Sequence, residues 1–126
     1  NLEILGRIVS TAVQGCNPDT MGLGPIGASQ KALERAKLKI KDIDIVELNE
    51  AFASQSLACI KDLQIDQSKV NIEGGALALG HPLGATGARI VGKAAQLLKR
   101  KNQKYALATQ CIGLGMGIAT VIETVE

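Results

Sequence analysis

Short apolar runs alternate along the chain with segments in which apolar residues recur every three or four positions, and this pattern predicts strands and helices in turn. Residues 4–13 are rich in Ile, Val, Thr and Ser, which is typical of a strand buried for much of its length. After a loop at 15–24, Pro25 suits the first turn of a helix whose apolar positions recur every three or four residues as far as Ala36. The pattern therefore predicts a first unit of strand, loop and helix.

The middle of the chain continues this alternation. Residues 45–48 have the length and content of a buried strand, and a helical pattern follows from Asn49, a residue type favoured at the N-cap. Residues 70–72 are compatible with a short strand. Residues 86–99 form the clearest amphipathic pattern in the chain, so we expect a long helix there.

Two final strands are expected at 105–109 and 117–122, and the linkage at 110–116 is short enough for neighbouring antiparallel strands. Strand and helix alternate up to this hairpin. We therefore predict an α/β fold with a mixed five-stranded sheet, mostly of parallel pairs with an antiparallel end, and helices packed on it. No repeat or long linker interrupts the sequence, which predicts one domain over residues 1–126.

Composition narrows the class of protein. The 126 residues are 46% hydrophobic, enough for a single core. The net charge of +2 comes from acids and bases mixed along the chain, without the basic stripe and aromatic residues of a nucleic-acid surface, and no apolar run reaches about 18 residues. We therefore expect neither a nucleic-acid partner nor a membrane span.

The number and spacing of the cysteines indicate the redox environment of the protein, and the first residue indicates whether the sequence is a fragment. The three cysteines are odd in number and far apart, which indicates neither a disulfide framework nor a zinc site, so a reducing compartment is expected. The sequence opens at Asn1 instead of Met. We therefore expect a fragment or a processed product, from which targeting signals could have been lost.

Candidate chemistry centres on the glycine-rich run 74–89, which holds the single histidine, His81. Gly80 before it and Pro82 after it favour a non-helical bend that presents the imidazole. A structural histidine hydrogen-bonded within a loop is an equal alternative at this point. The glycine spacing matches neither phosphate-binding pattern, so a nucleotide loop is disfavoured.

Two other candidates, Asn49 and Cys111, fall at junctions like the one beside His81. In α/β sheets such junctions at the carboxyl ends of strands bind ligands. The glycines after Cys111 allow backbone N–H groups to stabilise an anion, as an oxyanion hole requires. The alternatives are a small buried thiol at Cys111 and a simple helix cap at Asn49.

Three motifs in this sequence resemble the C-terminal active-site motifs of the thiolases, a family of acetyl-CoA acetyltransferases and 3-ketoacyl-CoA thiolases. They are Asn49–Ala53, the run 74–89 with Gly80-His81-Pro82, and Cys111-Ile112-Gly113 with the glycines that follow. The loop at 21–25 also resembles a thiolase loop near the acyl pocket. The similarity extends over residues 4–123, and three long motifs in the correct order make it specific.

This resemblance implies a thiolase-like fold and a role in reversible Claisen condensation and thiolytic cleavage of 3-ketoacyl-CoA. It implies that Cys111 is the acid/base that exchanges a proton with the α-carbon of acetyl-CoA, and that His81 activates the nucleophile and hydrogen-bonds a thioester oxygen. Asn49 would hold a water molecule beside His81. The resemblance further implies an oxyanion-hole donor at the Gly113 N–H and substrate-binding residues at Met21, Ala51 and Phe52.

The resemblance also implies what this chain lacks. The family's nucleophilic cysteine lies in an N-terminal half that precedes this stretch, and neither Cys16 nor Cys59 has the matching context. We therefore expect this chain to be inactive alone and to be completed by that N-terminal half. The intact enzyme is expected to be a homodimer or homotetramer that uses a coenzyme A thioester as substrate. No metal, no tightly bound cofactor and a cytoplasmic location are further expectations.

One departure from the family pattern concerns Leu114, where a glycine is usual. If that position requires a positive φ, leucine costs on the order of 1–2 kcal/mol there. Two other functions stay open: a non-catalytic scaffold or dimerisation module, and a simple acyl-CoA-binding module. Complementation with an N-terminal half separates the first from an enzyme, and titration of the chain with coenzyme A separates the second.

Overall fold

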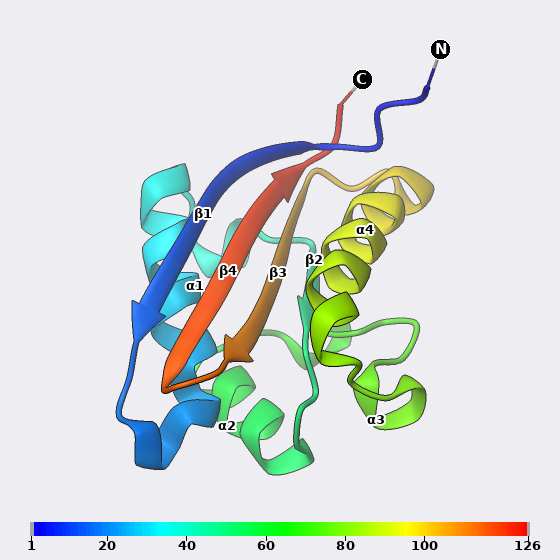
Figure 1. Ribbon diagram of the computed structural model, residues 1–126. Coiled ribbons are helices and arrows are strands. Elements are labelled where there is room, and N and C mark those ends of the chain that lie inside the picture. The colour runs from blue at the N-terminus through cyan, green and yellow to red at the C-terminus, as the bar shows by residue number, and fades with distance from the viewer. Residues whose placement is uncertain (1, 126) are drawn as a thin grey trace.

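The computed structural model describes residues 2–125, in which four strands and four α-helices alternate with short 3-10 turns (Figure 1). The strands are β1 (Arg7–Gly15), β2 (Ile45–Leu48), β3 (Tyr105–Ile112) and β4 (Met116–Glu123). The α-helices are α1 (Gly24–Ala36), α2 (Ala53–Leu63), α3 (Ala76–Leu79) and α4 (Leu83–Lys101). The 3-10 turns are η1 (Pro18–Leu23), η2 (Ile40–Asp42) and η3 (Gln67–Lys69).

The strands form one mixed sheet in the order β1-β4-β3-β2. Only β2 and β3 run parallel, whereas β4 is antiparallel to both of its neighbours. The predicted α/β class, mixed sheet and final hairpin are confirmed. The expectation of mostly parallel pairs is wrong, because the first strand joins β4 at the far edge of the sheet instead of lying beside β2.

The sheet has four described strands, not five, because residues 70–72 do not extend into a strand. Val70 makes one isolated parallel bridge to Val46, and the next residue, Asn71, has a φ of 46°. That left-handed conformation turns the chain away from the edge of β2 after a single pairing. The predicted short strand is therefore a turn against the sheet edge.

Helices cover the two faces of the sheet unequally. α1 and α2 lie on one face and build the larger apolar core, which includes Leu33, Val46, Leu48 and Leu107. α4 lies on the other face, where Ile90, Leu97 and Leu98 pack on Ile45 and Ile122 in a second core. Figure 1 shows α4 over β2 and β3, with β1 and β4 uncovered on that side.

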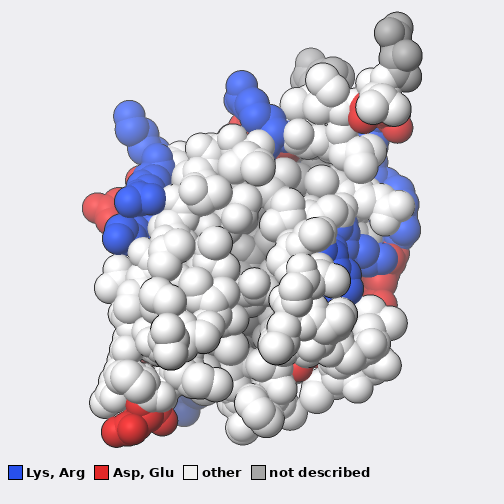
Figure 2. All heavy atoms as spheres, viewed as in Figure 1, with Lys and Arg blue, Asp and Glu red and all other residues white. Residues whose placement is uncertain are grey.

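The exposure of β1 corrects the expectation of a buried first strand. Ala12 faces α1 and is buried, but on the opposite face Ile8 and Val13 are 60% and 46% exposed. Their partners across the antiparallel ladder are Ile122 and Ile118 of β4. Figure 2, which views this side, shows a broad surface almost free of charged residues over these strands. We call it the open sheet face.

Helix boundaries also differ from the sequence pattern at two positions that matter for the site. α2 begins at Ala53 with Phe52 in the N-cap position, so Asn49 does not cap it. Asn49 is instead fully buried, and its backbone N–H donates to the carbonyl of Thr109 at 2.9 Å, which continues the pairing of β2 with β3. α4 begins at Leu83, directly after the His81-Pro82 bend, instead of at residue 86.

The final hairpin is tighter than expected. β3 continues as far as Ile112 and β4 starts at Met116, so Cys111 lies near the end of a strand and not at the tip of a loop. Leu114 in the turn has a φ of 66° and is 90% exposed. The turn therefore requires the left-handed conformation in which a leucine side chain is strained.

Among residues 2–125, no helix is both long and apolar enough to cross a membrane.

Candidate functional site

A pocket of about 540 Å³ opens where β3 ends, beside the bend that precedes α4. Six residues predicted for the site line it, from four separate segments of the chain: Met21, Ala51, Phe52, His81, Cys111 and Gly113. Leu83, Gln110 and Ile112 complete the wall. The sheet thus brings together at one edge residues that are far apart in sequence.

Asn49 lies behind this pocket and contacts its histidine. The Nδ2 of Asn49 is 3.4 Å from Nε2 of His81, and Asn49 is fully buried while His81 is half-buried. Asn49 is held by the sheet, because β2 ends one residue before it. The seventh predicted site residue is therefore placed against His81 and not on the pocket surface.

The other ring nitrogen of His81 faces Thr86 on the first turns of α4. Nδ1 lies 2.7 Å from Oγ1 of Thr86, and that hydroxyl donates to the carbonyl of Pro82 at 3.3 Å. We assign the hydroxyl hydrogen to the Pro82 carbonyl, so that the hydroxyl accepts from Nδ1–H of His81. The neutral imidazole then keeps its lone pair on Nε2, where the Asn49 amide donates to it.

The local sequence explains why the imidazole is presented in this way. Gly80 has a φ of 89°, a left-handed conformation that ends α3 and that glycine adopts without strain. Pro82 stands in the N-cap position of α4 with an extended ψ of 99°. His81 is thereby fixed between two helix ends, so the predicted bend is present in the structure.

Cys111 is half-buried beside the same pocket, and burial raises the pKa of its thiol above the ordinary value. A backbone hydrogen bond acts in the opposite direction but does not outweigh the desolvation. The net effect is that the Cys111 thiol is protonated at neutral pH, so it is ready to donate a proton as a general acid.

The other two cysteines lie outside the pocket wall. Cys59 is fully buried in α2, where burial raises the pKa of its thiol and its Sγ is 3.5 Å from the carbonyl of Gly22. Cys16 follows β1 and is half-buried, with Sγ 3.7 Å from the carbonyl of Met21. Among residues 2–125, no group of three or more His, Cys, Asp or Glu side chains could hold a metal ion.

Sequence reasoning missed a buried polar layer between α4 and the sheet. Glu47 of β2 is 1% exposed, and no hydrogen-bond partner among the described residues reaches either carboxylate oxygen. Burial raises the pKa of Glu47 to about 7, although Arg89 and Lys93 of α4 oppose the effect. The sequence did contain a sign of this buried acid, because Glu47 is the one charged residue in the otherwise apolar run 45–48.

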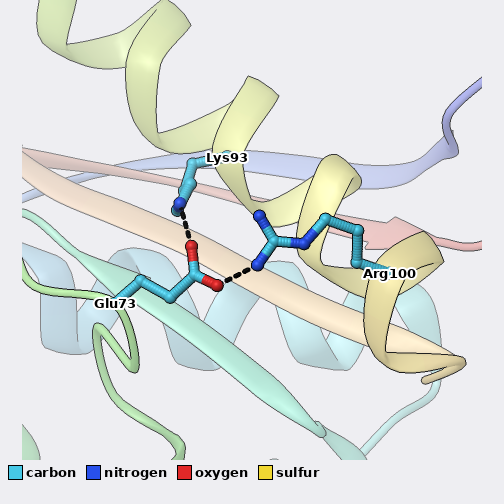
Figure 3. Close-up of polar contacts among 3 residues, drawn as sticks. All are labelled: Glu73, Lys93 and Arg100. Carbon is cyan, nitrogen blue, oxygen red and sulfur yellow. Dashed lines mark hydrogen bonds and ion pairs between the residues drawn. The ribbon is translucent and has the colours of Figure 1, made fainter.

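The segment that leads to His81 is also tied to the far half of α4. Glu73 forms ion pairs with both Lys93 and Arg100, which lie two turns apart on one side of that helix (Figure 3). The Lys93 ammonium, together with Arg100, holds the pKa of Glu73 below its ordinary value. Exposed pairs of this kind contribute little energy, so we read the contact as a tether for the 71–75 segment.

Comparison with known proteins identifies the family of this chain. Residues 2–124 match the family described as thiolase, C-terminal domain. The chain belongs to the thiolase family. Its sequence is 58% identical over 125 residues to a 3-ketoacyl-CoA thiolase of Vibrio parahaemolyticus, covering 97% of this chain and 32% of that protein. A 3-ketoacyl-CoA thiolase of Yersinia enterocolitica is also 58% identical, over 94% of the chain and 32% of the relative.

Solved structures agree with this assignment. Human mitochondrial 3-ketoacyl-CoA thiolase superposes with a TM-score of 0.96 at 49% identity, over 98% of this chain and 32% of the human one. A structure of that human enzyme in complex with CoA gives the same values. Bacillus anthracis acetyl-CoA acetyltransferase superposes with a TM-score of 0.95 at 44% identity over the same shares of both chains. The thiolase-like fold is thus confirmed, and this thiolase domain spans about a third of the length of these relatives.

Proposed function

We propose that this thiolase domain supplies the acid/base half of an active site for reversible Claisen condensation and thiolytic cleavage of 3-ketoacyl-CoA. The observation that carries the proposal is the shared pocket, where Cys111 from the end of β3 and His81 from the bend before α4 face the same space. Relatives that are named 3-ketoacyl-CoA thiolases support the reaction class. The substrate proposed for this chain is therefore a coenzyme A thioester.

His81 has the arrangement that two successive roles require. Its Nε2 lone pair is able to accept a proton from a thiol nucleophile, after which the Nε2–H donates to a developing thioester oxyanion. The contact of Nδ1 with Thr86 fixes the plane of the ring for both steps. Once Nε2 is protonated it no longer accepts from Asn49, and we propose that the Asn49 amide, 3.4 Å away, then donates to a water molecule that hydrogen-bonds the same thioester oxygen.

Cys111 is proposed as the group that exchanges a proton with the α-carbon. Removing that proton creates an enolate, so the base needs N–H donors aimed at the negative oxygen, and we assign one of these to Gly113 in the pocket wall. A thiol with a raised pKa is protonated at rest. In the direction of cleavage it donates its proton to the departing carbanion.

We further propose that an N-terminal thiolase half covers the open sheet face and provides the nucleophilic cysteine. The face is apolar where Ile8 and Val13 project from β1, and a monomer rarely leaves such a surface in water. Other exposed apolar side chains are Phe52 and Leu83 in the pocket wall and Leu77 and Leu79 of α3. Assembly of the completed subunit into a homodimer or homotetramer, and a cytoplasmic location, are part of the same proposal.

A chimeric enzyme tests the proposed reaction. This chain replaces the matching C-terminal third of the Vibrio parahaemolyticus 3-ketoacyl-CoA thiolase, and cleavage of acetoacetyl-CoA by coenzyme A is followed. We expect turnover in the chimera and none from the 126-residue chain alone. Cys111→Ala is expected to lower kcat by about 10²–10⁴, the range of a lost general acid/base.

Cys16→Ala is the matched control, because Cys16 lies outside the pocket wall, and it should keep kcat within about twofold. Equal activity in Cys111→Ala and the unmodified chimera would refute the acid/base role. A folded chimera without turnover would favour the scaffold function. Tight binding of coenzyme A by the chain alone would favour the acyl-CoA-binding module.

A further inference from the structure

The carboxylate of Glu50 joins two segments that carry different residues of the site. Its Oε1 accepts a hydrogen bond from Nδ2 of Asn71 at 2.7 Å, and its Oε2 accepts from the backbone N–H of Leu77 at 2.9 Å. Glu50 directly follows Asn49, and Leu77 lies in α3, which ends just before Gly80 and His81. One side chain therefore links the Asn49 segment to the His81 segment.

Asn71 anchors this link to the sheet. Its Oδ1 accepts from the backbone N–H of Leu48 at 3.0 Å, and its Nδ2 donates to the Leu48 carbonyl at 2.8 Å as well as to Glu50. The backbone N–H of Asn71 donates to the carbonyl of Val46 at 2.8 Å. A single buried asparagine thus occupies the edge of β2 as a neighbouring strand would, and it holds the Glu50 carboxylate at the same time.

Gly75 makes room for the carboxylate. A Cβ at this position would lie 2.5 Å from both Cδ and Oε2 of Glu50, far inside van der Waals contact. The Gly75 backbone has φ −136° and ψ −160°, which is extended and open to any residue. Gly75 is therefore required by the position of Glu50 and not by its own backbone, unlike Gly74 with a φ of 87°.

We propose that Glu50, Asn71 and Gly75 are positioning residues, here called the Glu50 clamp, that set the separation of Asn49 Nδ2 from His81 Nε2. Asn49 is fixed by the sheet, whereas His81 arrives after a loop and a single-turn helix, so the clamp adds a hydrogen-bonded link between the segments that carry the two residues. Its effect on catalysis rests on the proposed function. Both hydrogen-bond partners of the Glu50 carboxylate are N–H donors. A glutamine at position 50 would place its NH₂ group against one of these donors, and one of the two hydrogen bonds would be lost.

Kinetics of the chimera test the catalytic consequence. Glu50→Gln is expected to lower kcat roughly 10–100-fold with KM within about threefold, because displacing a catalytic group by about 1 Å costs on that order. Gly75→Ala should have a similar effect by displacing the carboxylate. In Glu50→Ala/Gly75→Ala the added methyl group enters space that the carboxylate has left, so this double variant should be no slower than Glu50→Ala.

Two controls isolate the clamp from general effects of substitution. Glu34→Gln removes an exposed carboxylate on α1, and Gly92→Ala adds a methyl group where no atom outside its own helix lies within 4 Å. Both should keep kcat within about twofold. If the fold losses of Glu50→Ala and Gly75→Ala multiply in the double variant, the two residues act independently and the clamp is refuted.

A measurement on the 126-residue chain itself does not depend on turnover. His81 is its single histidine, so one pair of imidazole ¹⁵N resonances reports the tautomer and the environment of the ring. Glu50→Gln should shift these resonances, and Glu34→Gln should leave them unchanged. Unaltered His81 resonances in a folded Glu50→Gln chain would overturn the clamp. An inactive chimera with the shifted resonances would overturn the proposed function and leave the clamp supported.

Discussion

The substitution Glu47→Gln tests how strongly the buried carboxyl group of Glu47 makes the stability of this domain depend on pH. The carboxyl is 1% exposed and without a hydrogen-bond partner among the described residues, and its pKa is raised to about 7 from an ordinary 4.5. The folded state therefore binds the proton more tightly than the unfolded state does. The contribution of Glu47 to stability is greatest at low pH and is lost as the pH rises from about 4.5 to about 7.

The magnitude follows from the size of this change in pKa. At about 1.4 kcal/mol per pKa unit, ionised Glu47 costs the folded state on the order of 3 kcal/mol at pH 8. Desolvation is the largest cause, and the opposing attraction of Arg89 and Lys93 is already included in the net value. A neutral glutamine of similar shape avoids this cost.

Urea unfolding of both chains at pH 5 and pH 8 measures the difference. The Glu47→Gln chain should match the parent at pH 5 and exceed its free energy of unfolding at pH 8 by on the order of 3 kcal/mol. Asp66→Asn is a control of opposite sign, because hydrogen bonds from Ser68 lower the pKa of that exposed carboxyl. An advantage of Glu47→Gln that is equal at both pH values would refute the reasoning.

Three further outcomes are expected. Gly117→Ala should destabilise the chain by at least about 2 kcal/mol in urea unfolding, because its Cβ would lie 2.1 Å from the backbone of Gly24, whereas Gly92→Ala in open space should be stabilising. Leu114→Gly should raise the melting temperature, since it relieves on the order of 1 kcal/mol of strain at a φ of 66°; a lowered value would contradict this. In sedimentation the chain alone should self-associate, and Val13→Lys should reduce this association; a monomer at high concentration would count against an open apolar face.

The fold was predictable where local pattern and tertiary contacts agree. The long helix after the histidine bend and the final hairpin were both evident in the sequence, because each pairs residues that are close along the chain. The place of the first strand was not. Its apolar content suggested burial, but whether a strand is central or at an edge depends on which distant strand it pairs with, here β4.

The positions of the candidate site residues could be anticipated only in part. The junctions at Asn49, His81 and Cys111 were visible as ends of periodic segments, and the structure brings them together. The role of Asn49 as a helix cap was a wrong alternative, because local propensity cannot show that the strand continues its pairing through that residue. The partnership of Glu50 with Gly75 was equally invisible, since it joins two loops that share no periodicity.

The residues around the pocket fall into two groups, which differ in whether contacts within this domain hold their side chains in place. Asn49 and His81 are held by contacts inside this domain: the sheet, Thr86 and the Glu50 clamp. Phe52, 63% exposed, and Leu83 form a wall with no such support. Substitutions in the clamp should therefore change kcat, because they move a preorganised group. If an N-terminal half completes that surface as proposed, substitutions in the wall should change KM and the preferred acyl group.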